Sequence, residues 1–175
     1  QDEDLLVQPD LQMETLLPYY NQIEVISGKA IKNRFKGDVQ YSLDTYRQKR
    51  FEYEKDGFRF YCFVDGYQED KEQSRVFEVK STTSKKFLDL SFRDEDGVKQ
   101  PIFMTTPEGI LRLREELLEP VNQNYHDKVK TLHDRLGNVG RYIYDIAYQR
   151  FVIEKSRASL DKSIRYYLAV LNSDY

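Results

Sequence analysis

Two carboxylates and a lysine stand in an order that suits metal-assisted chemistry. Asp65 follows the apolar run from Phe60 to Val64, and one residue separates Glu78 from Lys80. Side chains in an extended strand alternate between its two faces, so Glu78 and Lys80 point the same way. If the two segments pair as a hairpin, the carboxylates of Asp65 and Glu78 converge within a few ångströms.

Such a carboxylate pair favours a divalent cation. Two like charges repel at short range unless a cation lies between them, and carboxylate oxygens are hard ligands that suit Mg²⁺ or Mn²⁺. A lysine beside them can orient a water or stabilise charge that builds up on a phosphate. Alternating charges on the solvent face of a strand give the same spacing. The flanking residues are apolar, however, and buried carboxylates need a partner.

The residues before this pattern predict a helix. Between Tyr19 and Phe35 apolar residues recur three and four positions apart, and Gly37 is a suitable end. Residues 1–17 indicate a loosely attached segment or a short helix before this one, with breaks expected at Pro9 and Pro18.

Strands follow this helix. Lys55-Asp56-Gly57 is a hairpin turn signal between two aromatic segments. The second segment has bulky side chains on both faces, which predicts a central strand. The expected strands are 47–54, 58–65 and 75–82, with a polar loop at 68–74.

The second half of the chain is mainly helical in pattern, and it finishes with an apolar strand. Together with the first half this predicts an α/β fold, a mixed β-sheet with helices packed on it. The expected helices are 108–118, 125–136 and 139–156, and the expected last strand is 165–171.

Four segments also follow one another in a known order. They are Ser27–Lys32 (SGKAIK), Val64–Gly66 with Val76–Thr83 (VFEVKSTT), Asp145–Ile153 (DIAYQRFVI) and Tyr166–Asn172 (YYLAVLN). In this order they resemble the RecB-type (RecB-like) branch of the PD-(D/E)XK nuclease superfamily. In that branch an aspartate and a Glu/Asp-x-Lys lie on adjacent strands, between a helix with a glycine-led motif and a helix with a glutamine. The resemblance implies a restriction-endonuclease-like core.

The resemblance also implies a role for each residue. Asp65 and Glu78 would hold Mg²⁺ or Mn²⁺, with the backbone carbonyl of Val79 as a third ligand. Lys80 would assist the attacking water, and Gln149 would steady Lys80 or the substrate phosphate. A surface glutamine on an amphipathic helix is the alternative for Gln149. Helical geometry allows it to point at the sheet, because one face carries Tyr142, Asp145, Ile146, Gln149 and Ile153.

Three features depart from the family pattern. Many RecB-type nucleases have a histidine metal ligand in the glycine-led helix, where Lys32 stands here, and a protonated lysine cannot ligate a metal. Region 84–138 is longer than the expected connector, and it predicts a helical hairpin insertion that guides substrate or contacts a partner. Several relatives hold an iron–sulfur cluster, which the single cysteine, Cys62, excludes within this chain.

Composition limits how the chain can hold nucleic acid. The net charge is −3 and the pI about 5.5, whereas proteins that bind nucleic acid by charge alone are usually basic. Contacts must therefore come from local groups, although charge runs are commonly only solvated surface. The candidate phosphate-binding residues are Lys29, Lys32, Lys85 and Lys86. Exposed aromatics are candidates for base stacking, with core packing as the alternative for Tyr41, Tyr46, Phe51, Tyr53 and Tyr61.

Other features bear on location and on organisation. No apolar run approaches the roughly 20 residues of a membrane span, and no secretion signal is evident, so we expect a cytoplasmic protein. His126 and His133 are expected at the surface. The start at Gln1 suggests one domain, residues 1–175, within a longer polypeptide that has other domains.

The sequence thus predicts a metal-dependent nuclease that hydrolyses DNA phosphodiester bonds. We expect an exonuclease-like activity on ends or single strands in repair or recombination. The alternative, motivated by Lys32 and the acidic pI, is a catalytically weakened nuclease fold that serves as a nucleic-acid-binding or scaffolding module.

Overall fold

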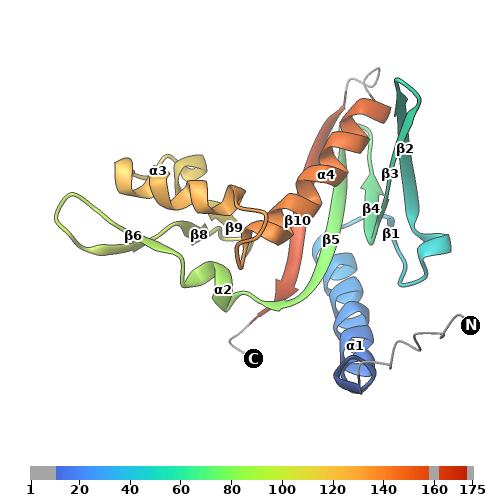
Figure 1. Cartoon of the computed structure of the whole chain (residues 1–175), viewed down its shortest axis with the longest axis horizontal. Coiled ribbons are helices and arrows are strands. Elements are labelled where there is room, and N and C mark those ends of the chain that lie inside the picture. The colour runs from blue at the N-terminus through green and yellow to red at the C-terminus, as the bar shows by residue number, and fades with distance from the viewer. Residues whose placement is uncertain (1–10, 158–161, 173–175) are drawn as a thin grey trace, which may run out of the picture.

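The computed structural model describes residues 11–157 and 162–172 (Figure 1). Its first elements are α1 (Leu11–Arg34), β1 (Val39–Tyr41), the 3-10 turn η1 (Thr45–Arg47), β2 (Lys49–Lys55), β3 (Phe58–Val64), β4 (Gly66–Glu69) and β5 (Gln73–Thr83). They are followed by α2 (Lys85–Leu88), β6 (Ser91–Arg93), β7 (Lys99–Pro101), β8 (Phe103–Thr105), β9 (Leu111–Leu113), η2 (Arg114–Leu117), α3 (Gln123–Lys130), η3 (Thr131–His133), α4 (Gly140–Ser156) and β10 (Ser163–Leu171).

A four-stranded mixed sheet, in the order β1-β4-β5-β10, lies at the centre. β4 pairs antiparallel with both β1 and β5, whereas β10 runs parallel to β5. Alternating side chains of β5 bury on opposite faces. Val76 packs with Val152 and Ile153 of α4, and Phe77 packs with Ile31 of α1. The sheet therefore lies between α1 and α4, which confirms the predicted α/β class with a mixed sheet and flanking helices.

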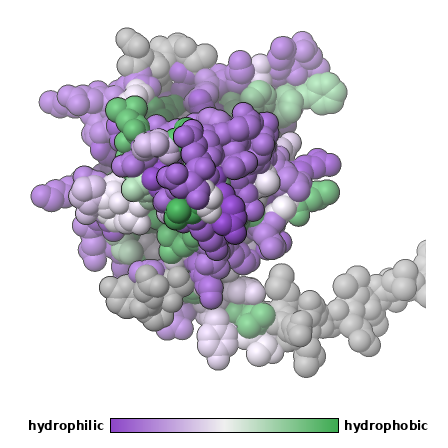
Figure 2. All heavy atoms as spheres, turned by 90° about the vertical axis from the view of Figure 1, so that its left-hand side faces the viewer, coloured by the Kyte–Doolittle hydropathy of each residue, from purple (hydrophilic) through white to green (hydrophobic). Residues whose placement is uncertain are grey.

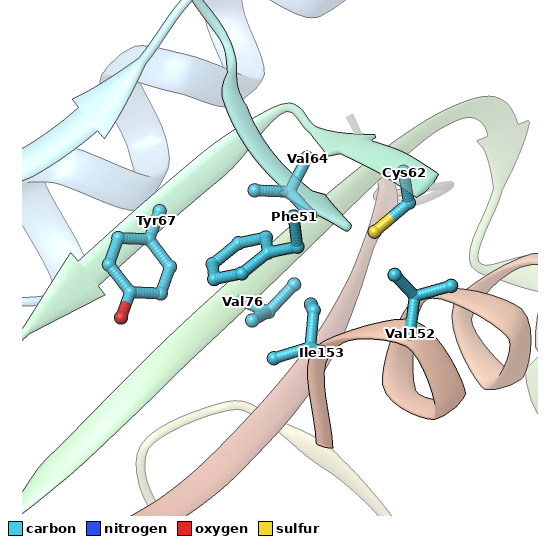
Figure 3. Close-up of a cluster of buried hydrophobic side chains, with 7 residues drawn as sticks. All are labelled: Phe51, Cys62, Val64, Tyr67, Val76, Val152 and Ile153. Carbon is cyan, nitrogen blue, oxygen red and sulfur yellow. The ribbon is translucent and has the colours of Figure 1, made fainter. Parts of the chain in front are cut away.

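The β2–β3 hairpin packs against α4. Its turn residues Asp56 and Gly57 both have positive φ, 53° and 78°, as a two-residue turn between twisted strands requires. The predicted turn is thus confirmed. Core side chains from the hairpin, the sheet and α4 meet in one cluster, Phe51, Cys62, Val64, Tyr67, Val76, Val152 and Ile153 (Figure 3).

The prediction of a central strand at 58–65 is wrong. Among the described strands, β3 pairs with β2 alone in a two-stranded sheet, and Phe58 and Tyr61 are exposed. The chain bends at Asp65, and the next strand, β4, forms the hairpin with β5. A Cβ on Gly66 would lie 3.1 Å from the Cβ of Phe77 and 3.3 Å from the Tyr41 ring, so this close approach after the bend favours glycine.

Region 84–138 is not the predicted helical hairpin. It contains two β-hairpins, β6–β7 and β8–β9, and two short α-helices, α2 and α3. The predicted helix at 108–118 is wrong, because Gly109, at φ 70°, closes the β8–β9 turn and Leu111 and Leu113 alternate as strand residues. The helix predicted at 125–136 is shorter, ending as η3 at His133.

The insertion has its own core and a polar outer surface. A cluster of Phe87, Phe92, Ile102, Tyr125, Leu132 and Val139 packs against Leu168 and Val170 of β10. Its outer surface is mostly hydrophilic with a few separate hydrophobic residues (Figure 2). The insertion is thus joined by apolar contacts to the edge strand of the sheet and to Tyr142 and Ile143 of α4, and its outer surface faces solvent.

The predicted polar loop at 68–74 is too long, because β4 ends at Glu69 and β5 begins at Gln73. The start of the chain needs a second correction. α1 begins at Leu11 and continues through Pro18, so the predicted break at Pro18 is wrong. Residues 1–10, with Pro9, lie outside the described part of the chain. The helix at 140–156 and the strand at 163–171 confirm the expected last two elements. Within the described residues, no helix combines the length and apolar character that crossing a membrane requires.

Candidate active site

Glu78 lies at the centre of the candidate site, on the α4 side of β5. Only 9% of it is exposed. Its Oε1 is 2.9 Å from the Lys80 Nζ, and its Oε2 accepts a 2.6 Å hydrogen bond from the Nε2 of Gln149. Lys80 also forms a 2.8 Å ion pair with Asp145 of α4. Strand alternation and one face of α4 therefore bring together the side chains that the sequence predicted.

The bend between β3 and β4 places Asp65 beside this group. Asp65 Oδ2 accepts a 2.8 Å hydrogen bond from the backbone N–H of Val79, and Oδ1 accepts one of 2.9 Å from Gln48 Nε2. The N–H and C=O of one strand residue point to the same edge, so the Val79 carbonyl is also directed toward Asp65. β4 begins opposite Phe77 and does not cover this edge at Val79.

The electrostatics of Asp65 reflect its burial. Burial and the neighbouring charge of Glu78 raise the pKa of Asp65 to about 7, although the Val79 N–H and Lys80 act in the opposite direction. Burial disfavours the charge on Lys80, yet hydrogen bonds to Asp145 and Glu78 outweigh it and raise the pKa of Lys80. Lys80 is therefore a cation at neutral pH, and it does not serve as a proton acceptor.

Glu24 of α1 is an acidic residue that the sequence reasoning missed. Burial and the charge of Glu78 raise the pKa of Glu24, and Glu24 in turn raises that of Asp65. The Tyr41 hydroxyl donates a 2.7 Å hydrogen bond to the Glu24 carbonyl. A Cβ on Gly28 would collide with the Tyr41 ring, so this glycine lets β1 approach α1 closely. The available signal was spacing, since Glu24, Gly28, Ile31 and Phe35 share one helix face.

The predicted basic residues do not gather at the carboxylates. Lys29, Lys32, Lys85 and Lys86 are exposed, and the Lys86 ammonium lies 5.7 Å from the centre of the Tyr142 ring. The α1 residue whose charge acts on Asp65 is Glu24 rather than Lys32.

Gln149 is not a surface glutamine, because only 7% of it is exposed. Besides Glu78, its Nε2 donates a 3.3 Å hydrogen bond to the Phe63 carbonyl. Within the described part of the chain, its buried Oε1 has no hydrogen-bond partner. Because Nε2 must face a carboxylate and a carbonyl, the amide cannot be reversed, and Oε1 remains a buried acceptor whose hydrogen-bonding capacity is unused among the described residues.

A cavity of about 380 Å³ opens over Glu78 and Gln149. Asp145 and three tyrosines, Tyr61, Tyr144 and Tyr148, complete most of its lining. A small group can therefore approach Glu78 and Gln149 from solvent.

The donors at the site are oxygens. Asp65, Glu78 and the carbonyl of Val79 form a hard donor set of the kind that Mg²⁺ and Mn²⁺ prefer. Among the described residues, no three histidine, cysteine, aspartate or glutamate side chains form a metal-binding group. No family model, curated protein or solved structure matches the chain, so functional inference rests on this side-chain geometry.

Proposed function

We propose that this chain is a metal-dependent nuclease of the PD-(D/E)XK kind that hydrolyses DNA phosphodiester bonds. The observation that carries the proposal is the pairing of Glu78 with both Lys80 and Gln149, at 2.9 Å and 2.6 Å. Asp65 joins them through the N–H of Val79. The sequence predicts these residues together, through their resemblance to the RecB-type motifs.

The topology supports the same assignment. Asp65 precedes β4 and Glu78 lies on β5, the two strands of an antiparallel hairpin, and α4 later leads to the parallel strand β10. Helices lie on both faces of the sheet. This order of elements is compatible with the restriction-endonuclease-like core that the resemblance implies, and so supports the proposal.

Asp65, Glu78 and the Val79 carbonyl would hold Mg²⁺ or Mn²⁺. The fit rests on two largely buried carboxylates, with the charge of Glu78 acting on Asp65, an arrangement that is costly without a cation to share. When bound, the cation would lower the pKa of a water and offset the charge on the phosphate.

The other residues of the site would position the attacking water and stabilise the charge on the phosphate. Lys80, a cation fixed by Asp145 and Glu78, can stabilise negative charge that develops on the phosphate. The free Oε1 of Gln149 can accept a hydrogen bond from the attacking water and so orient it. Glu24 adds negative charge on the α1 side of the pair.

A cleavage assay tests the proposal. The chain is incubated with labelled single- and double-stranded DNA, with Mn²⁺ or with chelator, beside the isosteric variants Asp65→Asn and Glu78→Gln. We expect cleavage by the unaltered chain with Mn²⁺ only, and at least a 100-fold loss in each folded variant. Equal cleavage by all three proteins, or by none of them, would contradict the proposal.

A second candidate is a catalytically weakened nuclease fold that acts as a nucleic-acid-binding or scaffolding module. One observation favours it: each oxygen of Asp65 and Glu78 already has a donor within the chain. The site could therefore be a self-contained polar network. Calorimetry separates the two, because a scaffold shows no Mn²⁺ binding that Glu78→Gln abolishes.

A further inference from the structure

Three tyrosines form an exposed strip beside the carboxylates. Tyr144 and Tyr148 are 53% and 42% exposed on α4, and Tyr61 is 51% exposed on β3. The Tyr148 hydroxyl donates a 3.2 Å hydrogen bond to the Tyr61 carbonyl, which joins the two elements. All three residues line the cavity at Glu78 and Gln149. We call these three residues the tyrosine strip.

Core packing does not account for these rings. The buried α4 residues of the nearby core are Val152 and Ile153, one turn further along the helix, whereas Tyr144 and Tyr148 stay exposed. Phe151 continues the exposed row of α4, but its ring packs edge-on against Tyr53 and Phe60 of the hairpin, at centroid distances of 6.1 Å and 5.7 Å. The tyrosine strip is thus the part of the aromatic surface that remains open next to the site.

The dimensions of the strip suit a single nucleic-acid strand. Tyr144 and Tyr148 are one turn apart, which is about 6 Å at 1.5 Å per residue, and stacked nucleotides rise about 3.4 Å each. The cavity volume of about 380 Å³ admits nucleotide units and is far too small for a double helix. Stacking on aromatic rings binds any base, since every base has a π face.

The charges beside the strip allow a single backbone to pass. The Arg50 guanidinium lies 5.4 Å from the centre of the Tyr61 ring and can face a phosphate. Asp145 and Glu78, which line the cavity, disfavour additional phosphates there. A strand that follows the strip therefore meets a cation beside Tyr61 and carboxylates at the candidate reaction centre.

We propose that the tyrosine strip binds single-stranded nucleic acid by base stacking and delivers the strand to the site at Glu78 and Lys80. Its delivery role rests on the proposed function, but its binding role does not. Stacking also explains how a chain of net charge −3 holds a polyanion without a large basic surface.

Fluorescence anisotropy tests the binding role. The Asp65→Asn chain, in chelator so that no strand is cut, is titrated with labelled DNA and RNA strands of about 15 nucleotides, with duplex DNA, and with an abasic strand of equal length. We expect single strands to bind at least tenfold more tightly than the duplex and the abasic strand. The DNA and RNA arms identify which sugar the strip prefers.

Variants locate the binding on the strip. Tyr144→Ala and Tyr148→Ala are each expected to weaken single-strand binding roughly 5- to 100-fold. Tyr148→Phe keeps the ring and should bind within about twofold of the parent, by the same stacking argument. Tyr19→Ala, on α1 at a ring that is 62% exposed, is the matched control. Thermal melts confirm that every variant is folded.

Duplex or abasic strands that bind as tightly as the single strand would overturn the inference, as would alanine variants that bind like the parent. A strip that binds no oligonucleotide, and serves a protein partner instead, would also overturn it. Failure of the nuclease proposal gives a different result: single strands bind through the strip, but the unaltered chain with Mn²⁺ leaves them intact.

Discussion

Gln149 and Glu78 are 71 positions apart in the chain and are joined by a buried hydrogen bond of 2.6 Å. The bond fixes α4 on the sheet. It uses the amide nitrogen of Gln149 and leaves the amide oxygen, Oε1, buried and without a partner within the described residues. One side chain therefore both supports the carboxylate and holds an unsatisfied acceptor next to it.

Replacing Gln149 by alanine should affect stability and activity together. Glu78 would lose a donor in a buried place, which costs about 1–3 kcal/mol of unfolding free energy. DNA cleavage should fall roughly 10-fold or more, because the water would lose its acceptor. Urea denaturation and the cleavage assay measure the two effects. Arg150→Ala, which removes an exposed α4 ion pair with Glu154, is the control and should cost under about 1 kcal/mol. Equal effects of the two variants would contradict the role of Gln149.

Asp65→Asn should stabilise the fold increasingly as pH rises. The folded pKa of Asp65 is about 7, above the ordinary value of 3.8, so protonation favours folding. That contribution is complete below about pH 4 and is lost as pH rises through 7. The variant does not titrate and escapes this loss. Its melting temperature should exceed that of the unaltered chain by about 2–6 °C at pH 8, and by much less at pH 5.

Differential scanning fluorimetry across this pH range measures the difference. Asp96→Asn, at an exposed loop position, serves as the control and should melt like the unaltered chain throughout. A difference in melting temperature for Asp65→Asn that does not change with pH would contradict the raised pKa.

Binding of Mn²⁺ should release protons. The cation and a proton compete for Asp65, whose pKa is about 7, so the affinity should rise as pH increases from 6 to 8 and level off above the pKa. Isothermal titration calorimetry in buffers of different ionisation enthalpy counts the released protons. Affinity that is equal at pH 6 and pH 8 would place the cation away from Asp65.

Gly28→Ala should destabilise the chain even though alanine is the better helix former. The added Cβ would collide with the Tyr41 ring and push α1, with Glu24, away from the sheet. We expect a loss of about 1–3 kcal/mol. Tyr41→Ala relieves the collision, so the double variant should lose less than the sum of the single losses. Strictly additive losses would mean that the close approach is unimportant.

The local sequence pattern was sufficient to predict which face of a helix or strand a site residue occupies. Glu78 and Lys80 share a strand face, and Gln149 lies on the buried face of α4, as their spacing indicated. The sequence did not predict Glu24, because its proximity to Glu78 depends on how α1 packs on the sheet. Gly28 was the one sequence feature that indicated close packing of α1. The bend at Asp65 was equally hidden, since the pattern 58–65 continues smoothly into it.

Where the local sequence pattern gave a wrong prediction, pairing between distant segments determines the observed structure. The leucines at 111, 113, 117 and 118 fit a helical period as well as an alternating one. The Gly109 turn and pairing with β8 select the strand. Bulk on both faces of β3 predicted a central strand, but α4 rather than a second strand covers its free edge through Tyr148 and Gln149.

A crystal structure of the chain soaked in Mn²⁺ tests the central claim most directly. We expect anomalous density for one ion at about 2.1 Å from oxygens of Asp65, Glu78 and the Val79 carbonyl, and none in a Glu78→Gln crystal treated in the same way. Carboxylates that keep their contacts with Gln48, Val79, Lys80 and Gln149 without any ion between them would contradict the metal site, and with it the nuclease proposal.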